Sequence, residues 1–202
     1  MGQIILDKRG EKLGVDLRKG GPGAARQFHF NLDWDDPAAG KKPGFFSFAR
    51  PQPVDLDLGC MYRLKDGDMG VIQPIGGNFG AKNSSPFIHL DKDDRSGAAA
   101  DGENLFVYRP EQIEKLLIFA LIYEGTANFS TVNGRLTIKD GAGTDILIRL
   151  DNKEPQLKLC AVALLEARGE KLEIVKEERY FAAHDSCDRH YGFGFRWKAG
   201  SK

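Results

Sequence analysis

The sequence has no excess charge of either sign and no long apolar run, and each absence excludes a class of protein. Lysine plus arginine and aspartate plus glutamate both number 29 in 202 residues, so no global field would draw the chain to nucleic acid or to an anionic membrane. No apolar stretch reaches the roughly 20 residues that a membrane-spanning helix needs. We therefore expect no nucleic-acid partner and no transmembrane segment.

Cysteine is also scarce. Cys60, Cys160 and Cys187 are odd in number and far apart in the sequence, which suits reduced thiols better than a disulfide framework. The apolar run from Ile4 to Leu6 is too short for a signal peptide. These features predict a cytoplasmic protein, and they leave open a peripheral position at the inner face of the membrane.

The motifs of common enzyme classes are missing as well. There is no nucleophile elbow, and the glycine cluster at residues 76–80 is not followed by the lysine and helix of a phosphate-binding loop. We therefore predict that the protein is not an enzyme.

What the sequence has in quantity is glycine and short alternating runs. Its 24 glycines separate segments in which apolar and polar residues alternate, most clearly over residues 28–34, 54–62 and 191–197, as in half-buried strands. In residues 116–123 and 157–165 both the odd and the even positions are largely apolar, which predicts central strands covered on both faces. The pattern predicts an all-β fold, an antiparallel β-sandwich, formed by a single domain over residues 1–202.

Turn residues predict where the chain reverses. Hairpin turns are expected at residues 65–67, 133–134, 140–143 and 168–170, and one helical turn is expected at residues 109–115, where a proline stands near the first position. Residues 35–53 contain four prolines and are predicted to form an inserted surface loop.

Acidic residues gather in two places. Asp55 and Asp57 are two apart in a predicted strand, so their side chains face the same way. A second cluster occupies the glycine-containing stretch of residues 91–104. Close carboxylates repel one another unless a cation neutralises them, and calcium takes about six to eight oxygen ligands. The two clusters together favour a calcium site, although acidic turns are usually solvated loops.

These residues resemble the TerD family of tellurite-resistance proteins. The segments that carry the resemblance are Val15-Asp16-Leu17-Arg18-Lys19-Gly20, Leu32-Asp33-Trp34-Asp35, Asp55-Leu56-Asp57, Ile88-His89-Leu90-Asp91-Lys92-Asp93-Asp94-Arg95-Ser96-Gly97, Asp101-Gly102-Glu103-Asn104 and Phe129-Ser130-Thr131-Val132-Asn133 with the strands that follow. The resemblance implies a calcium-binding β-sandwich linked to tellurite resistance and stress response. It also implies that the partners are other tellurite-resistance proteins, with a membrane-associated complex possible.

The resemblance also implies a set of metal ligands. The positions that match the motifs of the family are Asp55, Asp57, Asp93, Asp94, Asp101 and Glu103, with Asn104 a weaker candidate. Two departures matter. Ala98-Ala99-Ala100 stands where the family is more acidic, so we expect one calcium site and not two, and the long loop at residues 35–53 suggests a TerA-like subgroup.

Two further clusters have competing interpretations. The predicted loop mixes cationic and aromatic side chains, which could contact a membrane or a partner protein; they are Lys41, Lys42, Phe45, Phe46, Phe48 and Arg50. Such aromatic side chains more often cover the core. His184, Cys187 and His190 are three apart and would suit zinc if they were on a helix. Their neighbours favour an exposed hairpin tip instead.

Two other functions could use the same acidic cluster. A calcium-dependent hydrolase would use Asp55 or Asp57 in catalysis, because pairs of carboxylates hydrolyse glycosidic bonds. A lectin-like sandwich would bridge its calcium ion to sugar hydroxyl groups. A closed cage of ligands around the ion would favour a binding module. A deep cleft at the carboxylates would favour the hydrolase, and a shallow groove with aromatic side chains near the ion would favour the lectin.

Overall fold

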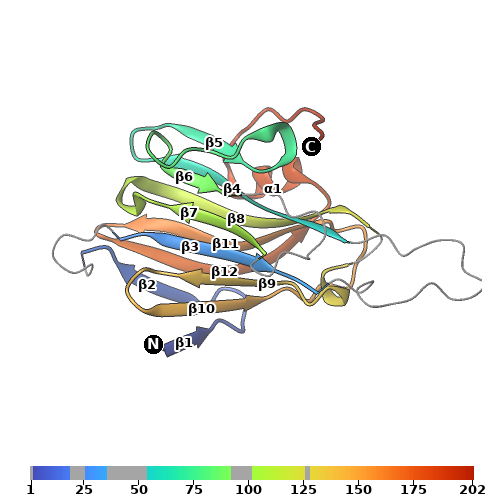
Figure 1. The fold of residues 1–202 in the computed structure, drawn as a ribbon, viewed down its shortest axis with the longest axis horizontal. Helices are drawn as coiled ribbons and strands as arrows, with labels where there is room; N and C mark the ends of the chain where they lie inside the picture. The colour runs from blue at the N-terminus through green and yellow to red at the C-terminus, as the bar shows by residue number, and fades with distance from the viewer. Residues whose placement is uncertain (1, 19–25, 36–53, 92–101, 126–127) are drawn as a thin grey trace, which may run out of the picture.

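The computed structural model of the chain describes residues 2–18, 26–35, 54–91, 102–125 and 128–202. Two six-stranded sheets stack on one another (Figure 1). In spatial order, sheet A contains β1 (Gly2–Ile5), β10 (Thr144–Arg149), β9 (Arg135–Lys139), β3 (Phe28–Asp33), β7 (Glu103–Val107) and β6 (Ile88–Leu90). Sheet B contains β2 (Lys12–Asp16), β12 (Lys171–Phe181), β11 (Leu159–Arg168), β8 (Ile113–Glu124), β4 (Asp55–Leu64) and β5 (Met69–Ile72). Only β1 and β10 pair in parallel among these strands, so the predicted antiparallel β-sandwich is confirmed.

Helical structure is short in the described residues. α1 (His184–Tyr191) is an α-helix, and η1 (Ile75–Gly77), η2 (Pro110–Gln112) and η3 (Phe129–Thr131) are 3-10 turns. η2 is the predicted helical turn, and Pro110 lies at its start, where a missing N–H group has no cost.

Two apolar clusters fill the molecule. The larger lies between the sheets and includes Phe28, Leu58, Ile118 and Ile138. The smaller lies on the outer face of sheet B, where α1 and residues 193–197 cover Met61, Phe119 and their neighbours. β8 and β11 are therefore covered on both faces, as their continuous apolar runs predict. β4 was expected to be half buried, and this was wrong because the second cluster covers its outer face too.

Most of the predicted turns are where the sequence places them. Residues 65–67, 140–143 and 168–170 connect β4 to β5, β9 to β10 and β11 to β12. At Asn133-Gly134 the chain does turn, with a φ of 48° at Asn133, but the expected hairpin is wrong because the turn connects η3 to β9 and not two paired strands. Asn128 caps η3 through its side chain.

The C-terminal region differs most from the prediction. The expected hairpin tip at residues 184–190 is the helix α1, and the expected strand at residues 191–197 is an extended segment outside both sheets. The alternation of aromatic residues and glycines reflects packing of Phe193 and its neighbours on the outer face of sheet B. Figure 1 shows α1 and the C-terminus beside β4 and β5. We call residues 193–202 the C-terminal segment.

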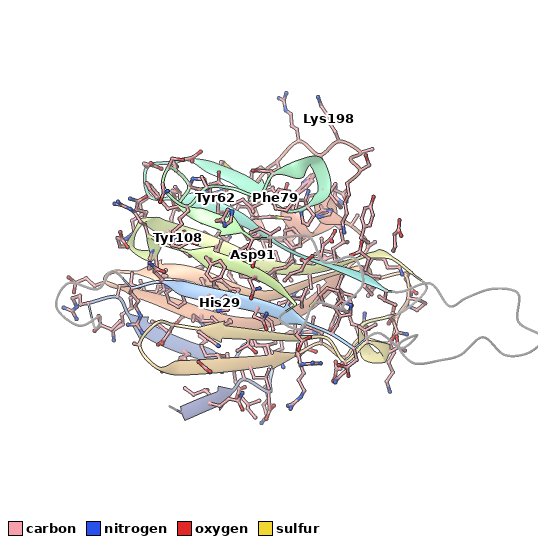
Figure 2. All side chains as sticks on the ribbon, viewed as in Figure 1. His29, Tyr62, Phe79, Asp91, Tyr108 and Lys198 are labelled. Carbon is pink, nitrogen blue, oxygen red and sulfur yellow. The ribbon has the colours of Figure 1, made fainter. Side chains whose placement is uncertain are left out.

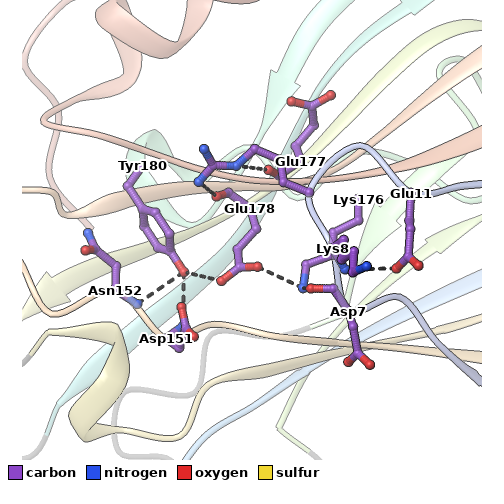
Figure 3. Close-up of polar contacts among 10 residues, drawn as sticks. Asp7, Lys8, Glu11, Asp151, Asn152, Lys176, Glu177, Glu178 and Tyr180 are labelled. Carbon is purple, nitrogen blue, oxygen red and sulfur yellow. Dashed lines mark hydrogen bonds and ion pairs between the residues drawn. The ribbon is translucent and has the colours of Figure 1, made fainter.

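β12 contains a bulge with a buried ionic network. Ala161 pairs with Arg179 but Ala163 pairs with Lys176, so two residues of β12 lie opposite one of β11. Glu178 in this bulge has a left-handed φ of 42°, a conformation that a non-glycine residue adopts only with support from its surroundings. Its carboxylate is 2.8 Å from Nζ of Lys176 and accepts a hydrogen bond from Tyr180 at 3.2 Å (Figure 3).

The predicted inserted loop and its contact residues Lys41, Lys42, Phe45, Phe46, Phe48 and Arg50 lie outside the described residues, apart from Asp35 at the start of the loop. In the part of the chain that the structure describes, no helix is long and apolar enough to cross a membrane.

Candidate metal site

Asp55 and Asp57 begin β4, and both carboxylates point to the outer face of sheet B. Leu56 and Leu58, which alternate with them, point into the main core. The two aspartates are only 3% and 1% exposed. Trp34 fixes the entry into β4, since its Nε1 donates a hydrogen bond to the carbonyl of Val54 at 3.1 Å. The structure thus brings the predicted aspartate pair together in a buried position.

A lysine from the other end of the chain lies between the two carboxylates. Nζ of Lys202 is 2.6 Å from Oδ2 of Asp55 and 2.5 Å from Oδ1 of Asp57, and its side chain is 4% exposed. The ammonium also lies 4.5 Å from the centre of the Tyr123 ring, in the range of a cation–π contact. A register shift of β4 against β8 skips Tyr123, so a bulge places this ring beside the pair.

The geometry of the Asp55–Asp57 pair bears on whether it can bind a metal ion. Two carboxylate oxygens converge on one point that already holds a positive charge, at distances similar to the 2.3–2.6 Å of calcium–oxygen contacts. Carboxylate oxygens are the kind of ligand that a divalent cation such as calcium takes. The two oxygens that face Lys202 therefore have the chemistry and the convergence of a pair of metal ligands.

Glu103 reaches the same strand from the opposite sheet. It begins β7 in sheet A, is fully buried, and its Oε2 accepts a hydrogen bond from the backbone N–H of Leu58 at 2.6 Å. The hydrogen bond holds β4 one residue after Asp57. Glu103 thus supports the backbone of β4 through its Oε2 atom, from the inner face of the sheet, whereas the two aspartate side chains lie on the outer face.

Asn104 points away from Glu103, because neighbouring residues on a strand face opposite sides. Its Oδ1 is 2.7 Å from Nε2 of His29 and accepts a hydrogen bond from Asn31 at 3.0 Å. Its Nδ2 donates a hydrogen bond to Asp91 at 3.2 Å. Figure 2 shows His29 and Asp91 on the face of sheet A that is turned toward the viewer, so these contacts of Asn104 belong to a second polar cluster.

The remaining predicted ligands, Asp93, Asp94 and Asp101, lie outside the described residues. Among the residues that are described, no group of three or more histidine, cysteine, aspartate or glutamate side chains is arranged to hold a metal ion. The Asp55–Asp57 pair supplies two ligands, and a complete calcium shell needs further oxygens.

The possible zinc ligands are on a helix, as zinc binding would require, but they lie in different surroundings and are not arranged as a metal-holding group in the described structure. Cys187 is buried and His190 is exposed, while the ring of His184 stacks on Trp197 at 4.8 Å and meets the edge of Phe119 at 5.3 Å. Burial lowers the pKa of His184 from 6.5 to about 4, and it raises the pKa of the Cys187 thiol to about 12. These side chains pack the outer face of sheet B.

Sequence reasoning missed Lys202. The residue follows Gly200 and Ser201 with no motif around it, and it meets Asp55 across 147 positions of sequence. Only the path of the C-terminal segment over sheet B brings it there. A lysine beside a glycine and a serine is normally solvated, so no local signal could have identified it.

The fold and the site define a class of protein: an antiparallel β-sandwich of two sheets with a buried aspartate pair at the start of one strand. No protein-family model matches the sequence. The chain is 33% identical to the tellurium resistance protein TerA of Alcaligenes sp. over 180 residues, which are 87% of this chain. The chain belongs to the Ter family of TerD-like proteins. It spans about half, 52%, of the length of this relative.

Proposed function

We propose that the chain is a calcium-binding, non-catalytic module with a role in tellurite resistance and stress response. The observation that carries the proposal is the buried aspartate pair at the start of β4, whose two carboxylates already share one cation. The name of the relative, a tellurium resistance protein, supports the biological setting.

In this proposal Asp55 and Asp57 are the fixed ligands of one calcium ion. Asp93, Asp94 and Asp101 supply further oxygens from the segment that precedes β7, and Glu103 holds β4 in register. The bound ion orders that acidic segment and so completes a surface for partner proteins. The proposed partners are other tellurite-resistance proteins, in a complex at the inner face of the membrane.

Burial of the pair supports binding over hydrolysis. A glycosidic substrate must reach both catalytic carboxylates, whereas Asp55 and Asp57 are 3% and 1% exposed and are covered by Lys202. A small ion that displaces the lysine needs far less room than a sugar.

The test is the melting temperature of metal-stripped protein as calcium is added. A ligand that binds only the folded state stabilises it by about 2.7 kcal/mol at 100 times its dissociation constant, so we expect a rise that saturates with calcium. The Asp57→Asn, Asp93→Asn double variant should lose this rise. Asp151→Asn, which changes an exposed aspartate elsewhere, is the matched control and should retain it. A wild-type melting temperature that stays constant up to millimolar calcium would refute the proposal.

A further inference from the structure

The two sheets end in the edge strands β1, β6, β2 and β5, and these edges are protected to different degrees. Along β6, residues 79–81 form backbone hydrogen bonds with Ile88 and Leu90 at 2.8 and 2.9 Å. Beside β5, the side chain of Asn78 donates a hydrogen bond to the carbonyl of Val71 at 2.6 Å. β2 carries a charged side chain at each end. Covering segments and charged side chains are the usual means by which a protein protects a sheet edge.

β1 has neither protection among the described residues. It consists of Gly2, Gln3, Ile4 and Ile5, so it contains no charged side chain and no proline. Ile4 and Ile5 are 37% and 45% exposed, and they are two of the three large apolar side chains that are exposed in the described part of the chain. Figure 1 shows β1 as the lowest strand in the view, below both β10 and β2. The strand is therefore accessible to another chain.

The backbone of β1 directs half of its polar groups away from sheet A. The N–H of Leu6, directly after β1, donates a hydrogen bond to the carbonyl of Leu147 at 3.3 Å, as the parallel register of β1 with β10 requires. Backbone groups point alternately to the two sides of a strand, so Ile4 also faces β10, whereas Gln3 and Ile5 face the free edge. The N–H and carbonyl groups of these two residues are a template for one more strand.

We propose that this strand is β1 of a second copy of the chain, and that the two β1 strands pair antiparallel across a two-fold axis at Ile4. In this register Gln3 lies opposite Ile5 of the second copy, and the backbone groups of both residues face the free edge. Such a pair exchanges both of its hydrogen bonds, and the two-fold axis creates the pair twice. The inference goes beyond the proposed function, because it does not involve the calcium site.

The side chains match across the same axis. Ile4 lies opposite Ile4 of the second copy on the inner face of sheet A, where it lines a cavity of about 300 Å³ together with Leu13 and Val15 of β2. The second isoleucine would cover the mouth of this cavity and bury apolar surface on both copies. On the outer face, Ile5 meets the aliphatic part of Gln3. The exposed isoleucines of β1 thus gain partners in the dimer.

Charge favours an identical partner. The chain has no net charge, so two copies do not repel one another as highly charged proteins do. No charged residue lies within Gly2–Ile5, so the two-fold axis brings no like charges face to face along the paired strands. A strongly charged partner would gain nothing from this edge, whereas a second copy satisfies both its backbone groups and its apolar side chains.

Sedimentation equilibrium tests the dimer through its mass. Over concentrations from about 1 μM to about 1 mM, we expect the mass of the wild type to rise from 22.4 kDa toward twice that value. Ile5→Pro removes an N–H that faces the free edge, where an edge strand tolerates proline, and should weaken the dimer at least about tenfold. Ile4→Lys places like charges opposite each other and should abolish it. The control, Met69→Lys, changes the third exposed apolar side chain, on β5, and should dimerise as the wild type does.

A cysteine at the two-fold axis tests the register. Residues that face each other without hydrogen bonds in antiparallel strands have Cα atoms about 4.5 Å apart, which suits a disulfide. Ile4→Cys should therefore form a disulfide-linked dimer on mild oxidation. Ile5→Cys should do so much more slowly, because its counterpart in the second copy is displaced along the strand. The three native cysteines are buried, so they do not compete.

The outcomes decide the proposal without reference to calcium. A wild type that stays at 22.4 kDa up to about 1 mM would overturn it, as would a dimer that Ile5→Pro and Ile4→Lys both retain. Ile5→Cys that cross-links as fast as Ile4→Cys would overturn the two-fold register. The melting temperature of each variant checks that it is folded. If Ile4→Lys does not fold, Ile5→Pro and the cross-linking of Ile4→Cys still decide.

Discussion

Glu103 on sheet A accepts a hydrogen bond from the backbone N–H of Leu58 on sheet B at a distance of 2.6 Å. The bond crosses the sandwich and joins the start of β7 to the strand that carries Asp55 and Asp57. β5 pairs with β4 only from Cys60 onward, and no other described strand pairs with β4 on that side at Leu58. Within the described residues, a carboxylate from the other sheet thus takes the place of a neighbouring strand.

Two substitutions at Glu103 separate this support from metal ligation. Glu103→Ala leaves the buried N–H of Leu58 unsatisfied and should lower the free energy of unfolding by about 1–3 kcal/mol, as denaturant titration would measure. Glu103→Gln can still accept the hydrogen bond, so it should cost less. If Glu103 is also a calcium ligand, Glu103→Gln will weaken calcium binding as well. An alanine variant as stable as the wild type would contradict the supporting role.

The buried network on β12 gives a second prediction. Lys176 and Glu178 are 2.8 Å apart with side chains 5% and 13% exposed, and removal of one partner of a buried ion pair typically costs about 3–5 kcal/mol. Glu178→Gln should therefore destabilise the protein by about 3 kcal/mol in denaturant titration. Glu173→Gln breaks an ion pair with Lys12, whose side chain is 56% exposed, and as the control it should cost under about 1 kcal/mol. Similar losses of stability in Glu178→Gln and Glu173→Gln would contradict a stabilising role for the buried ion pair.

His184 gives a pH dependence of stability. Above pH 6.5 its imidazole is neutral in the folded and unfolded states, so its favourable packing against Trp197 is fully present. As the pH falls through 6.5 the unfolded chain takes up a proton that the folded protein accepts only near pH 4, and stability is lost across that window. We expect the melting temperature of the wild type to fall more between pH 6.5 and 4 than that of His184→Phe. His190→Asn changes an exposed histidine and is the control, so its melting temperature should fall as much as that of the wild type. An equal fall in His184→Phe would show that His184 does not cause this pH dependence.

The cysteines give a prediction about reactivity. All three are free and buried, and burial raises the thiol pKa of Cys187 to about 12 and that of Cys60 and Cys160 above its ordinary value. Because the thiolate is the reactive form, a thiol-specific reagent should label none of them in the native protein at pH 8 and all three after unfolding. Rapid labelling of the native protein that disappears in Cys187→Ser would show that α1 leaves this thiol accessible.

The sequence predicts most of the fold because its strongest patterns are local. The continuous apolar runs of β8 and β11 and the glycine turns at residues 65–67, 140–143 and 168–170 each specify structure within a few residues. The alternation at residues 191–197 failed as a predictor, because apolar residues that alternate along an extended segment can pack on a sheet without joining it.

The candidate site was predictable only in part. Period-two spacing placed Asp55 and Asp57 on one face, and the structure confirms that they share it. The cation between them comes from Lys202, 147 positions beyond Asp55. Such contacts depend on the tertiary path of the chain, which no local pattern encodes.

Calorimetric titration of metal-stripped protein with calcium tests the central claim most directly, since it reports binding and stoichiometry together. We expect one calcium ion per chain in the wild type, and no detectable binding in the Asp55→Asn, Asp57→Asn double variant, which lacks both negative charges of the buried pair. Asp151→Asn should bind as the wild type does. Heats of binding that persist undiminished in the double variant, or no binding by the wild type at millimolar calcium, would contradict the assignment of this pair as a calcium site.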